Sequence, residues 1–543
     1  MTFPTTTQHM SANASRRPRI CIATTMGGYD HASVLDSVLA RALDVRGADV
    51  EVLLCNKGVP TCQMIKLGPT RAMPEELAAQ KPMSYCDFCV DRGEKTFGKL
   101  GYPIQSLGDY ITPVDAEFAR RTAESIPFED IRAFDWYGLP VGDHAFAGAL
   151  RYFARGDLEN EPYGEQVLRV YLEAGLRTIA AIRRMVQQRR YDILVINHGI
   201  YIPQGMIAEV ARGMGVRVVT YNPAYRKHSF VFSHNESYHF TMLDEPVEHW
   251  NSLDLTPELT RDIRAYLWSR RSGTNDWIWF HDAPKEDIAP VLTEVGCDPS
   301  KPYVALLTSV VWDAQLHYKA NAFPSMMDWL VQTVEYWGKR QDDLQLVIRV
   351  HPAEVRGSVP SRQLCAEELK KAFPEGLPKN VFVLEPQNQA STYALCENAN
   401  SVIIYNTKAG VEMASMGVPV IVAGEAWVRG KGFAIDASSP KDYFRILGGL
   451  PLPEAMTSER RLLADRYAYH FFFRRMIPLP FIRVWKTGHF VADIKDKSEL
   501  KPGAWPGLDT ICEGILTGKP FIYPAESLAD PFPGEAAAPE AAA

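Results

Sequence analysis

The sequence predicts an α/β fold: two doubly wound, Rossmann-like domains that face a cleft. Short apolar runs rich in β-branched residues alternate with segments of helical spacing, which is typical of parallel sheets with crossover helices. The alternation stops in a polar stretch around residues 270–298 and then restarts. With 543 residues, the chain is also too long for one ordinary hydrophobic core, which favours two domains.

The first half contains two units in which strands and helices alternate. The expected elements are a strand at Arg19–Thr25, a glycine loop at Met26–His31, a helix at Ala32–Arg46, a strand at Asp49–Cys55, a strand at Tyr191–His198, a helix near Met206–Met214 and a strand at Val216–Tyr221.

The second half carries five short β-branched runs separated by helix-like segments. The expected strands are Tyr303–Thr308, Leu344–Val350, Val381–Leu384, Ser401–Tyr405 and Val418–Ala423. Doubly wound sheets bind ligands at the carboxyl ends of their strands. Two such sheets facing one another form the GT-B arrangement.

These patterns divide the chain into five segments. We expect a disordered lead at 1–17, an acceptor-side Rossmann-like domain at 18–285, a nucleotide-binding Rossmann-like domain at 286–455, C-terminal helices at 456–522 that pack back on the first domain, and a disordered tail at 523–543, which is rich in Pro, Ala and Glu.

Composition excludes several classes of protein. Lysine and arginine number 58 against 65 aspartate and glutamate, a net charge of −7, which argues against a nucleic-acid binder with a broad basic face. No run of about 18 apolar residues and no apolar signal core is present, so neither a spanning helix nor a secretion signal is expected. Nine scattered cysteines are typical of a reducing cytoplasm.

One apolar strand ends at a His-Pro pair. Proline cannot continue the strand, so His351-Pro352 places an imidazole at the strand's carboxyl end, with Arg349 on the same face. A histidine there can donate a hydrogen bond to a phosphate oxygen. The alternative interpretation is a histidine that caps a turn.

A second motif follows the strand at Ser401–Tyr405. Thr407 is expected at or near the N-cap of a helix, where its hydroxyl and free amides can hold an anion. Gly410 permits close approach of a phosphate or ribose, and Glu412 can accept bonds from both ribose hydroxyls. An ordinary strand–helix–strand unit with a good cap is the alternative.

Two flanking loops add candidate nucleotide contacts. Ser391 and Thr392 lie between the two motifs, and Arg429 and Lys431 follow in a glycine-interrupted loop. A solvated charged turn explains that last loop equally well.

With these motifs in order, residues 344–436 resemble the nucleotide-binding half of the capsule polysaccharide biosynthesis family, which includes Kdo transferases of capsule linkers. The segment is more distantly similar to bacterial CMP-sialic acid transferases and teichoic-acid glycerophosphotransferases. The resemblance implies a GT-B fold, with His351 on the donor phosphate, Ser391 and Thr392 or Thr407 supporting it, and Glu412 on the ribose. The first 280 residues match only in architecture.

The first domain offers candidate catalytic and acceptor-binding groups. Asp30 or His31, after the Gly27-Gly28 turn, is a candidate base for the acceptor hydroxyl, with Asp30 favoured; a helix-capping aspartate is the alternative. His198 also ends a strand. Candidate acceptor contacts after the strand at Val216–Tyr221 are Tyr225, Arg226 and Lys227, for which an ordinary surface loop is an equally good interpretation.

Two further clusters have open interpretations. Four thiolates can make a tetrahedral zinc site, but buried free thiols are favoured over zinc, and a redox pair is a third alternative; the cysteines are Cys55, Cys62, Cys86 and Cys89. Residues 460–486 interleave arginines with aromatics, typical either of a face on an anionic membrane leaflet or of a helix between domains.

The leading hypothesis is a cytoplasmic glycosyltransferase of bacterial surface polysaccharide synthesis. An alternative location is the cytoplasmic face of the inner membrane, as a peripheral protein. Its donor is a nucleotide-activated sugar, with CMP-Kdo or a related CMP-sugar favoured, and its acceptor is a saccharide or a lipid-linked saccharide. No Asp-x-Asp pair occurs, so catalysis is expected to need no metal or other cofactor. The alternatives are a CDP-polyol phosphotransferase, a sugar-nucleotide epimerase and a non-catalytic nucleotide-binding subunit of an assembly complex.

Overall fold

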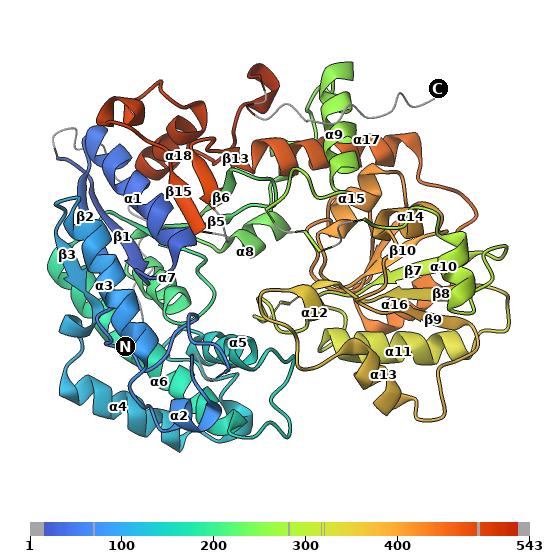
Figure 1. Cartoon of the computed structure of the whole chain (residues 1–543), viewed down its shortest axis with the longest axis horizontal. Coiled ribbons are helices and arrows are strands. Elements are labelled where there is room, and N and C mark those ends of the chain that lie inside the picture. The colour runs from blue at the N-terminus through green and yellow to red at the C-terminus, as the bar shows by residue number, and fades with distance from the viewer. Residues whose placement is uncertain are drawn as a thin grey trace.

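The computed structural model describes residues 16–529 and 531, except 69–70, 278, 281–282, 317, 320 and 486–488. Two sheets with helices around them form the two halves of the molecule (Figure 1). This arrangement confirms the predicted fold class of two Rossmann-like domains.

The first sheet has seven strands in the order β13-β6-β5-β4-β1-β2-β3. Its strands are β1 (Arg19–Thr25), β2 (Asp49–Leu54), β3 (Ile104–Ser106), β4 (Ile193–Asn197), β5 (Arg217–Pro223), β6 (Ser229–His234) and β13 (Ile477–Pro478). β1 to β5 are parallel, with the strand order 3-2-1-4-5, whereas β6 and β13 are antiparallel to their neighbours.

The second sheet has six strands in the order β12-β11-β10-β7-β8-β9, and all of its pairings are parallel. Its strands are β7 (Tyr303–Leu307), β8 (Gln345–Arg349), β9 (Val381–Leu384), β10 (Val402–Ile404), β11 (Val420–Val422) and β12 (Ile435–Asp436). Numbered within the domain, this order is 3-2-1-4-5-6, the doubly wound order of dinucleotide-binding folds.

In both sheets the strand order reverses between the first and fourth strands. In the first sheet this switch point lies between β1 and β4, and in the second between β7 and β10. Ligands of open α/β sheets bind outside the carboxyl ends of the strands at such points. The loops after β1, β4, β7 and β10 are therefore where the fold itself places a site.

Helices cover the faces of both sheets (Figure 1). In the first half they are α1 (Asp30–Val45), α2 (Pro74–Ala78), α3 (Ser84–Gly98), α4 (Pro113–Ser125), α5 (Val141–Phe153), α6 (Gly164–Arg189), α7 (Gln204–Gly213) and α8 (Tyr238–Leu243). The next helix, α9 (Pro257–Ser269), shares the hydrophobic core of the second half. In the second they are α10 (Ala289–Glu294), α11 (Met326–Gly338), α12 (Ala353–Arg356), α13 (Cys365–Ala372), α14 (Thr392–Glu397), α15 (Ala409–Ser415) and α16 (Pro440–Gly448).

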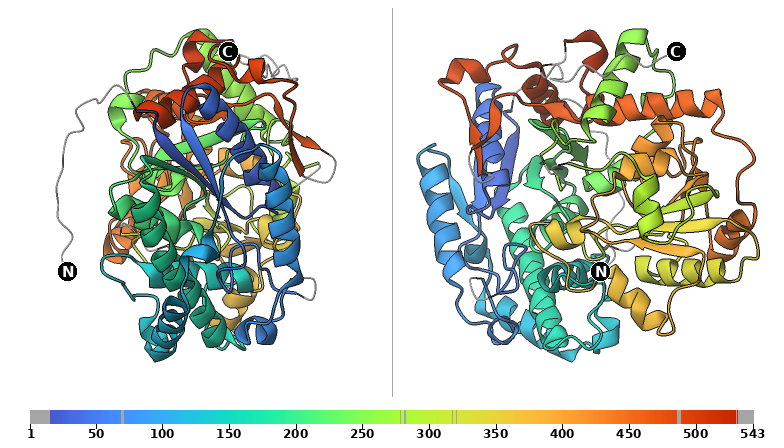
Figure 2. Two further views of the ribbon diagram at one scale, coloured as in Figure 1. Left: turned by 90° about the vertical axis from the view of Figure 1, so that its left-hand side faces the viewer. Right: turned by 45° about the vertical axis from the view of Figure 1, so that its right-hand side comes forward.

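The C-terminal segment crosses from the second half back to the first (Figure 2, orange to red). It comprises α17 (Ser458–Tyr469), a π-helical turn (His470–Arg474), β13, the hairpin β14 (Ile482–Trp485) and β15 (His489–Ala492), and α18 (Pro506–Thr517). Strand β13 pairs with β6, and α18 joins the hydrophobic core beneath α1. The segment thus contains strands as well as the predicted helices.

Buried aromatics in residues 467–473 favour the other interpretation of this segment, a helix packed between the domains. Tyr467, Phe471 and Phe472 are at most 3% exposed, so they belong to the core and present no apolar face to a lipid surface. His470 and Arg475 bind Glu245 at 2.8 and 3.3 Å. Burial alone would raise the pKa of Glu245, but Arg475 and His470 outweigh it and hold that pKa at about 2.

The ordered chain also extends beyond both predicted ends. Most of the expected lead lies outside the described residues, but Arg16 forms an ion pair with Asp192 at 2.6 Å. At the other end, Tyr523 is 5% exposed and its amide donates to the carbonyl of Arg474. The predicted tail therefore starts too early. In the described part of the chain, no helix is both long and apolar enough to cross a membrane.

Candidate functional site

The carboxyl ends of the two sheets meet at their switch points. Tyr201 follows β4, and its hydroxyl donates to the carboxylate of Asp313, which follows β7, at 2.6 Å. The same hydroxyl accepts from the amide of Ala314 at 2.8 Å. This contact joins loops of the two domains that are 112 residues apart in the sequence.

Asp313 is an accessible carboxylate at this junction. Its side chain is 56% exposed, and the guanidinium of Arg151, on α5, lies 3.7 Å from it. Partial desolvation by the surrounding protein would by itself raise the pKa of Asp313, but Arg151 and Tyr201 outweigh it and lower that pKa. The carboxylate is therefore ionised at neutral pH while remaining in contact with solvent.

His198 lies directly after β4, at the end of a strand as predicted, and near the carboxylate of Asp313. Its φ of +68° is in the left-handed region, which a non-glycine residue adopts at some cost in energy. The imidazole packs against Tyr201 and Tyr238, with ring centroids 5.0 and 6.1 Å apart. Burial lowers the pKa of His198 to about 3, and its Nδ1 has no hydrogen-bond partner among the described residues. A neutral imidazole of that kind is a weak base but a good hydrogen-bonding group.

Asp30 and His31 lie farther out, under the β14–β15 hairpin. Asp30 is the first residue of α1 and binds His489 at 2.6 Å and Arg92 at 3.3 Å. His31 packs edge-on against Phe490 at 4.4 Å, and burial lowers its pKa. The favoured base of the sequence prediction thus holds α1, α3 and the hairpin together. Its partner His489 is 459 residues away, so the pattern around Asp30 gave no sign of it.

The second sheet presents hydroxyls and an imidazole at its carboxyl edge. His351 follows β8, where its amide donates to the hydroxyl of Thr308 at 3.0 Å and its Nδ1 accepts from the amide of Ala353 at 3.0 Å. Because Nδ1 accepts, the ring proton of a neutral His351 lies on Nε2. Pro352 is the N-cap residue of α12.

Two further polar side chains extend this edge across the switch point. The hydroxyl of Ser309, after β7, donates to the side-chain oxygen of Asn406, after β10. Next to it, the hydroxyl of Thr407 accepts from the amide of Ala409 at 3.4 Å. Thr308, Ser309, His351 and Thr407 therefore form one polar edge, of which the sequence motifs identified two members.

Arg349 is a correction to the predicted nucleotide contacts. It is 2% exposed, and its guanidinium donates to the carbonyls of Glu385 at 2.7 Å and Asn388 at 2.9 Å. Burial lowers its pKa to about 10, so it stays charged at neutral pH. Its charge fixes the loop that leads to Ser391 and does not face a ligand.

Glu412 is a second correction. Its side chain is 1% exposed and binds Lys408 at 2.7 Å and Arg270 at 3.0 Å, and Tyr393 donates to it at 2.5 Å. Burial alone would raise its pKa, but Arg270 and Lys408 hold that pKa at about 2. A ribose cannot reach this enclosed carboxylate. Its interactions join α9, α14 and α15.

Gly410 also serves packing and not a ligand. A Cβ at this position would lie 2.6 Å from a side-chain carbon of Ile404 and 3.0 Å from one of Val428. The space that glycine leaves is therefore filled by the chain itself, which corrects its predicted role beside a phosphate.

The remaining predicted contacts are bonded to the protein. Ser391 caps α14 through the amide of Ala394 at 3.3 Å, and Thr392 lies 3.5 Å from Arg349 Nε. Arg429 donates to the carbonyls of Gly424 and Ala437 at 2.9 and 2.7 Å.

Three of them, Lys431, Arg226 and Lys227, bind backbone carbonyls across different loops. Lys431 donates to Leu243 at 2.8 Å, Arg226 to Phe472 at 3.3 Å, and Lys227 to Thr274 at 2.5 Å. Tyr225 packs on the ammonium of Lys408, 4.6 Å from the ring centroid. These interactions correct the predicted acceptor role of residues 225–227.

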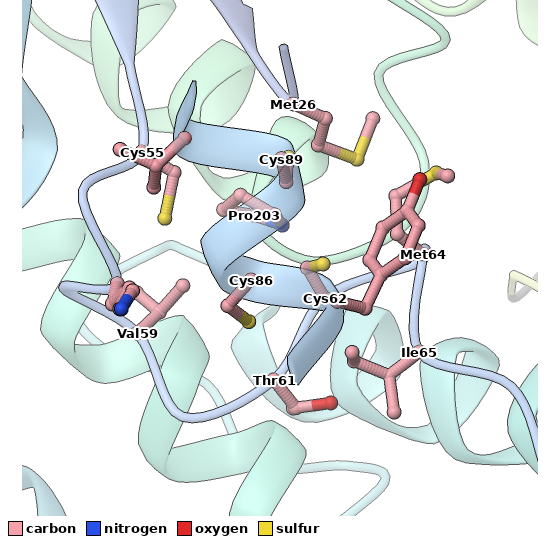
Figure 3. Close-up of a pocket in the computed structure, with 13 residues that line it drawn as sticks. Met26, Cys55, Val59, Thr61, Cys62, Met64, Ile65, Cys86, Cys89 and Pro203 are labelled. Atoms are coloured by element: carbon pink, nitrogen blue, oxygen red, sulfur yellow. The ribbon is translucent and has the colours of Figure 1, made fainter. Parts of the chain in front are cut away.

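The four clustered cysteines line one small cavity with Met26 and Met64 (Figure 3). The cavity holds about 30 Å³, and all four thiols are free. Burial raises the pKa of Cys86 to about 11 and also raises that of Cys89, so these thiols are protonated. Among the described residues, no three Cys, His, Asp or Glu side chains are grouped to hold a metal ion. Zinc at this position stays a prediction without geometric support.

Residues 288–456 match the capsule polysaccharide biosynthesis protein family. The matched segment supplies the second sheet and its polar edge, and it includes residues 344–436. The predicted resemblance to this family is thereby confirmed for that part of the chain. No curated protein matches the chain.

Solved structures resemble the chain at low sequence identity. The beta Kdo 2,4 transferase of Thermosulfurimonas dismutans KpsC is 12% identical with a TM-score of 0.32, covering 51% of this chain and 79% of its own. The beta Kdo 2,7 transferase of the same KpsC is 14% identical with a TM-score of 0.30, covering 59% and 88%. The MnaA–UDP structure from S. aureus is 11% identical with a TM-score of 0.28, covering 92% and 96%.

Sequence reasoning missed the residues at the domain junction. Arg151, Tyr201 and Asp313 belong to no recognisable motif, and their contact depends on how the two domains meet. The one available signal for Asp313 was its place a few residues beyond the expected strand at Tyr303–Thr308, because the loop after a first strand borders the switch point.

Proposed function

We propose that the protein is a glycosyltransferase of GT-B type that uses a nucleotide-activated sugar in capsule or other surface polysaccharide synthesis. The observation that carries the proposal is the meeting of both switch points, where Asp313 of one domain binds Tyr201 of the other at 2.6 Å. The family match over residues 288–456 favours polysaccharide synthesis as the context. The cytoplasm, where nucleotide sugars are made, is the proposed location.

The proposed donor is CMP-Kdo or a related CMP-sugar. Its single phosphate would lie at the polar edge formed by Thr308, Ser309, His351 and Thr407, with His351 Nε2 as the donor of a charge-assisted hydrogen bond. Hydroxyls and an imidazole suit one phosphate better than the two of a nucleotide diphosphate. Because the chain contains no Asp-x-Asp pair, we propose turnover without a divalent metal.

The transfer needs a base for the acceptor hydroxyl. The acceptor oxygen bonds to the anomeric carbon while the bond from that carbon to the phosphate oxygen breaks, and CMP leaves with the electron pair. Asp313 is the accessible carboxylate at the junction, and we propose that it takes the hydroxyl proton. Asp30 is the rival from the sequence, but it is already bound to His489 and Arg92.

A nucleotide-binding screen tests the donor class first. Melting temperatures are measured with CMP, CDP, UDP and GDP, because a ligand that binds only the folded state stabilises it by RT ln(1 + [L]/Kd). CMP is expected to give the largest shift. A shift with UDP alone would favour the epimerase alternative, and a larger shift with CDP than with CMP would favour the CDP-polyol phosphotransferase.

A second experiment separates an enzyme from a binding subunit. The release of CMP from CMP-Kdo, by hydrolysis or by transfer, is measured with and without EDTA. Release above the uncatalysed rate in EDTA supports a metal-independent transferase. CMP binding without any release in the presence of acceptor extracts would contradict catalysis and leave the non-catalytic alternative.

A further inference from the structure

Three cationic side chains gather above the carboxyl edge of the first sheet. Lys66 and Arg71 lie in the loop after β2, and Arg151 lies on α5 beside the junction. Arg71 packs over the ring of Tyr85, 3.7 Å from its centroid, and Arg151 packs over Tyr201 at 4.8 Å. These aromatic faces fix the planes of both guanidinium groups, which limits the entropy lost when a ligand binds.

Two nitrogens of this group are left without hydrogen-bond partners. Arg71 Nη1 and Arg151 Nε are buried and have no hydrogen-bond partner among the described residues. Buried polar nitrogens without partners are uncommon in folded proteins because each one forgoes its solvation. Both of these belong to charged groups at one edge, so a shared partner explains them together.

The charges of the three side chains are also poorly balanced. Within the described residues, Asp313 is the one carboxylate in ion-pair distance of any of them, 3.7 Å from Arg151. Burial lowers the pKa of Lys66, and repulsion from Arg151 and Arg71 lowers it further. Lys66 and Arg71 thus have no carboxylate partner among the described residues. An anion bound beside these side chains would offset this repulsion.

We propose that Lys66, Arg71 and Arg151 bind an anionic group, phosphate or carboxylate, of the acceptor. The inference rests on the proposed function in one respect, namely that the ligand is the acceptor. Its place supports that assignment, because the three cations lie on the first domain and the candidate donor phosphate edge lies on the second. Arg151 touches the proposed base Asp313, so an acceptor held here has its hydroxyl near that carboxylate.

This site replaces the acceptor contacts predicted from the sequence. Arg226 and Lys227 donate hydrogen bonds to the carbonyls of Phe472 and Thr274. Lys66 and Arg71 form no ion pair and donate to no carbonyl among the described residues. The difference decides which cations are available to a ligand.

Binding of small anions to the whole protein tests the proposal directly. Glucuronate is compared with glucose, and glycerol 3-phosphate with glycerol, by ligand-observed NMR titration at low salt without nucleotide. Each anion is expected to bind at least about 10-fold more tightly than its neutral counterpart, since two charge-assisted hydrogen bonds distinguish them. The tighter of the two anions identifies the site as one for carboxylate or for phosphate.

The double variant Lys66→Gln/Arg71→Gln is expected to lose at least about 10-fold in affinity for the preferred anion. The matched control is Lys95→Gln/Arg121→Gln, which removes the same two charges from exposed surface positions and is expected to bind as the wild type does. Unchanged melting temperature of the double variant establishes that it folds. Equal losses in both double variants would show only a general charge effect, and no loss in either would overturn the proposal.

The outcome is separable from that of the proposed function. Nucleotide binding at the second domain is measured on the same double variant and is expected to be unchanged. Loss of anion binding with intact CMP binding supports both proposals. Intact anion binding in the double variant, with CMP binding also intact, overturns the acceptor site and leaves the transferase standing. Anion binding without binding of any nucleotide overturns the transferase alone.

Discussion

The two edges that meet at the domain junction use their charges in opposite ways. On the second sheet, the charged groups next to the motifs are buried and bound by the chain, as in Arg349 and Glu412. On the first sheet, Arg71 and Arg151 keep nitrogens without partners, and Asp313 joins them from the other domain as an exposed carboxylate. A charge beside a nucleotide-binding motif is therefore no guide to ligand contact until its partners are known.

The largest change in stability is expected when the buried carboxylate of the second domain, Glu412, is removed. Glu412→Ala should destabilise the protein by about 3–5 kcal/mol, because removing one member of a buried ion cluster leaves Arg270 and Lys408 uncompensated. Denaturant unfolding measures the loss. If the variant were stable and lost more affinity for CMP than for deoxy-CMP, relative to the wild type, Glu412 would be the ribose contact after all.

The same cluster predicts an acid-sensitive stability. The folded-state pKa of Glu412, at about 2, lies below the ordinary value of about 4.3 for an unfolded glutamate. Its contribution is thus complete above the unfolded pKa and is lost as pH falls toward 2. The free energy of unfolding should fall between about pH 5 and 2. This fall should be shallower in Glu412→Gln, and equal slopes in the two proteins would contradict the assignment.

Turnover should depend on Asp313 more than on Asp30. Asp313→Asn keeps the shape and removes the basicity, so CMP release should slow by about 10²-fold or more with CMP affinity nearly unchanged. Asp30→Asn should lower the melting temperature through its bonds to His489 and Arg92 and leave turnover largely intact. The reverse pattern in these two variants would return the base to Asp30.

Nucleotide affinity should respond to His351 by a smaller amount. His351→Ala removes the expected hydrogen bond to the donor phosphate, which contributes about 1.5–3 kcal/mol. Calorimetry with CMP measures the change, and Arg349→Lys serves as a neighbouring comparison whose effect should fall on stability. If CMP binds His351→Ala as tightly as the wild type, the polar edge of the second sheet is not the phosphate site.

Much of the fold could be predicted because parallel strands carry a local signal. The apolar runs at Arg19–Thr25 and Val381–Leu384 coincide with β1 and β9, because the side chains of these strands are buried or half-buried. The antiparallel strand β13 could not be found in this way. It has two residues and pairs with β6 about 250 positions earlier, so only the tertiary fold defines it.

The site could be predicted only as far as its strand ends. His351 and His198 do lie at the carboxyl ends of β8 and β4, where proline or glycine breaks the strand. What a side chain binds there depends on distant residues, as the 2.6 Å contact between Tyr201 and Asp313 shows. A sequence pattern contains the position of a charge but not the identity of its partner.

The smallest change in stability is expected from Tyr201→Phe, which tests whether Asp313 is the base. In Tyr201→Phe, Asp313 loses one hydrogen bond that favours its ionised form, so its pKa rises and the acidic limb of the pH–rate profile should move to higher pH. The free energy of unfolding should fall by only about 1 kcal/mol. Tyr318→Phe is the matched control, because Tyr318 donates to the carbonyl of Ala314 at 2.9 Å in the same loop. It should lose similar stability without moving the acidic limb. A profile that shifts in both variants would trace the effect to the loop, whereas a shift in neither would mean that the group titrating in that limb is not Asp313.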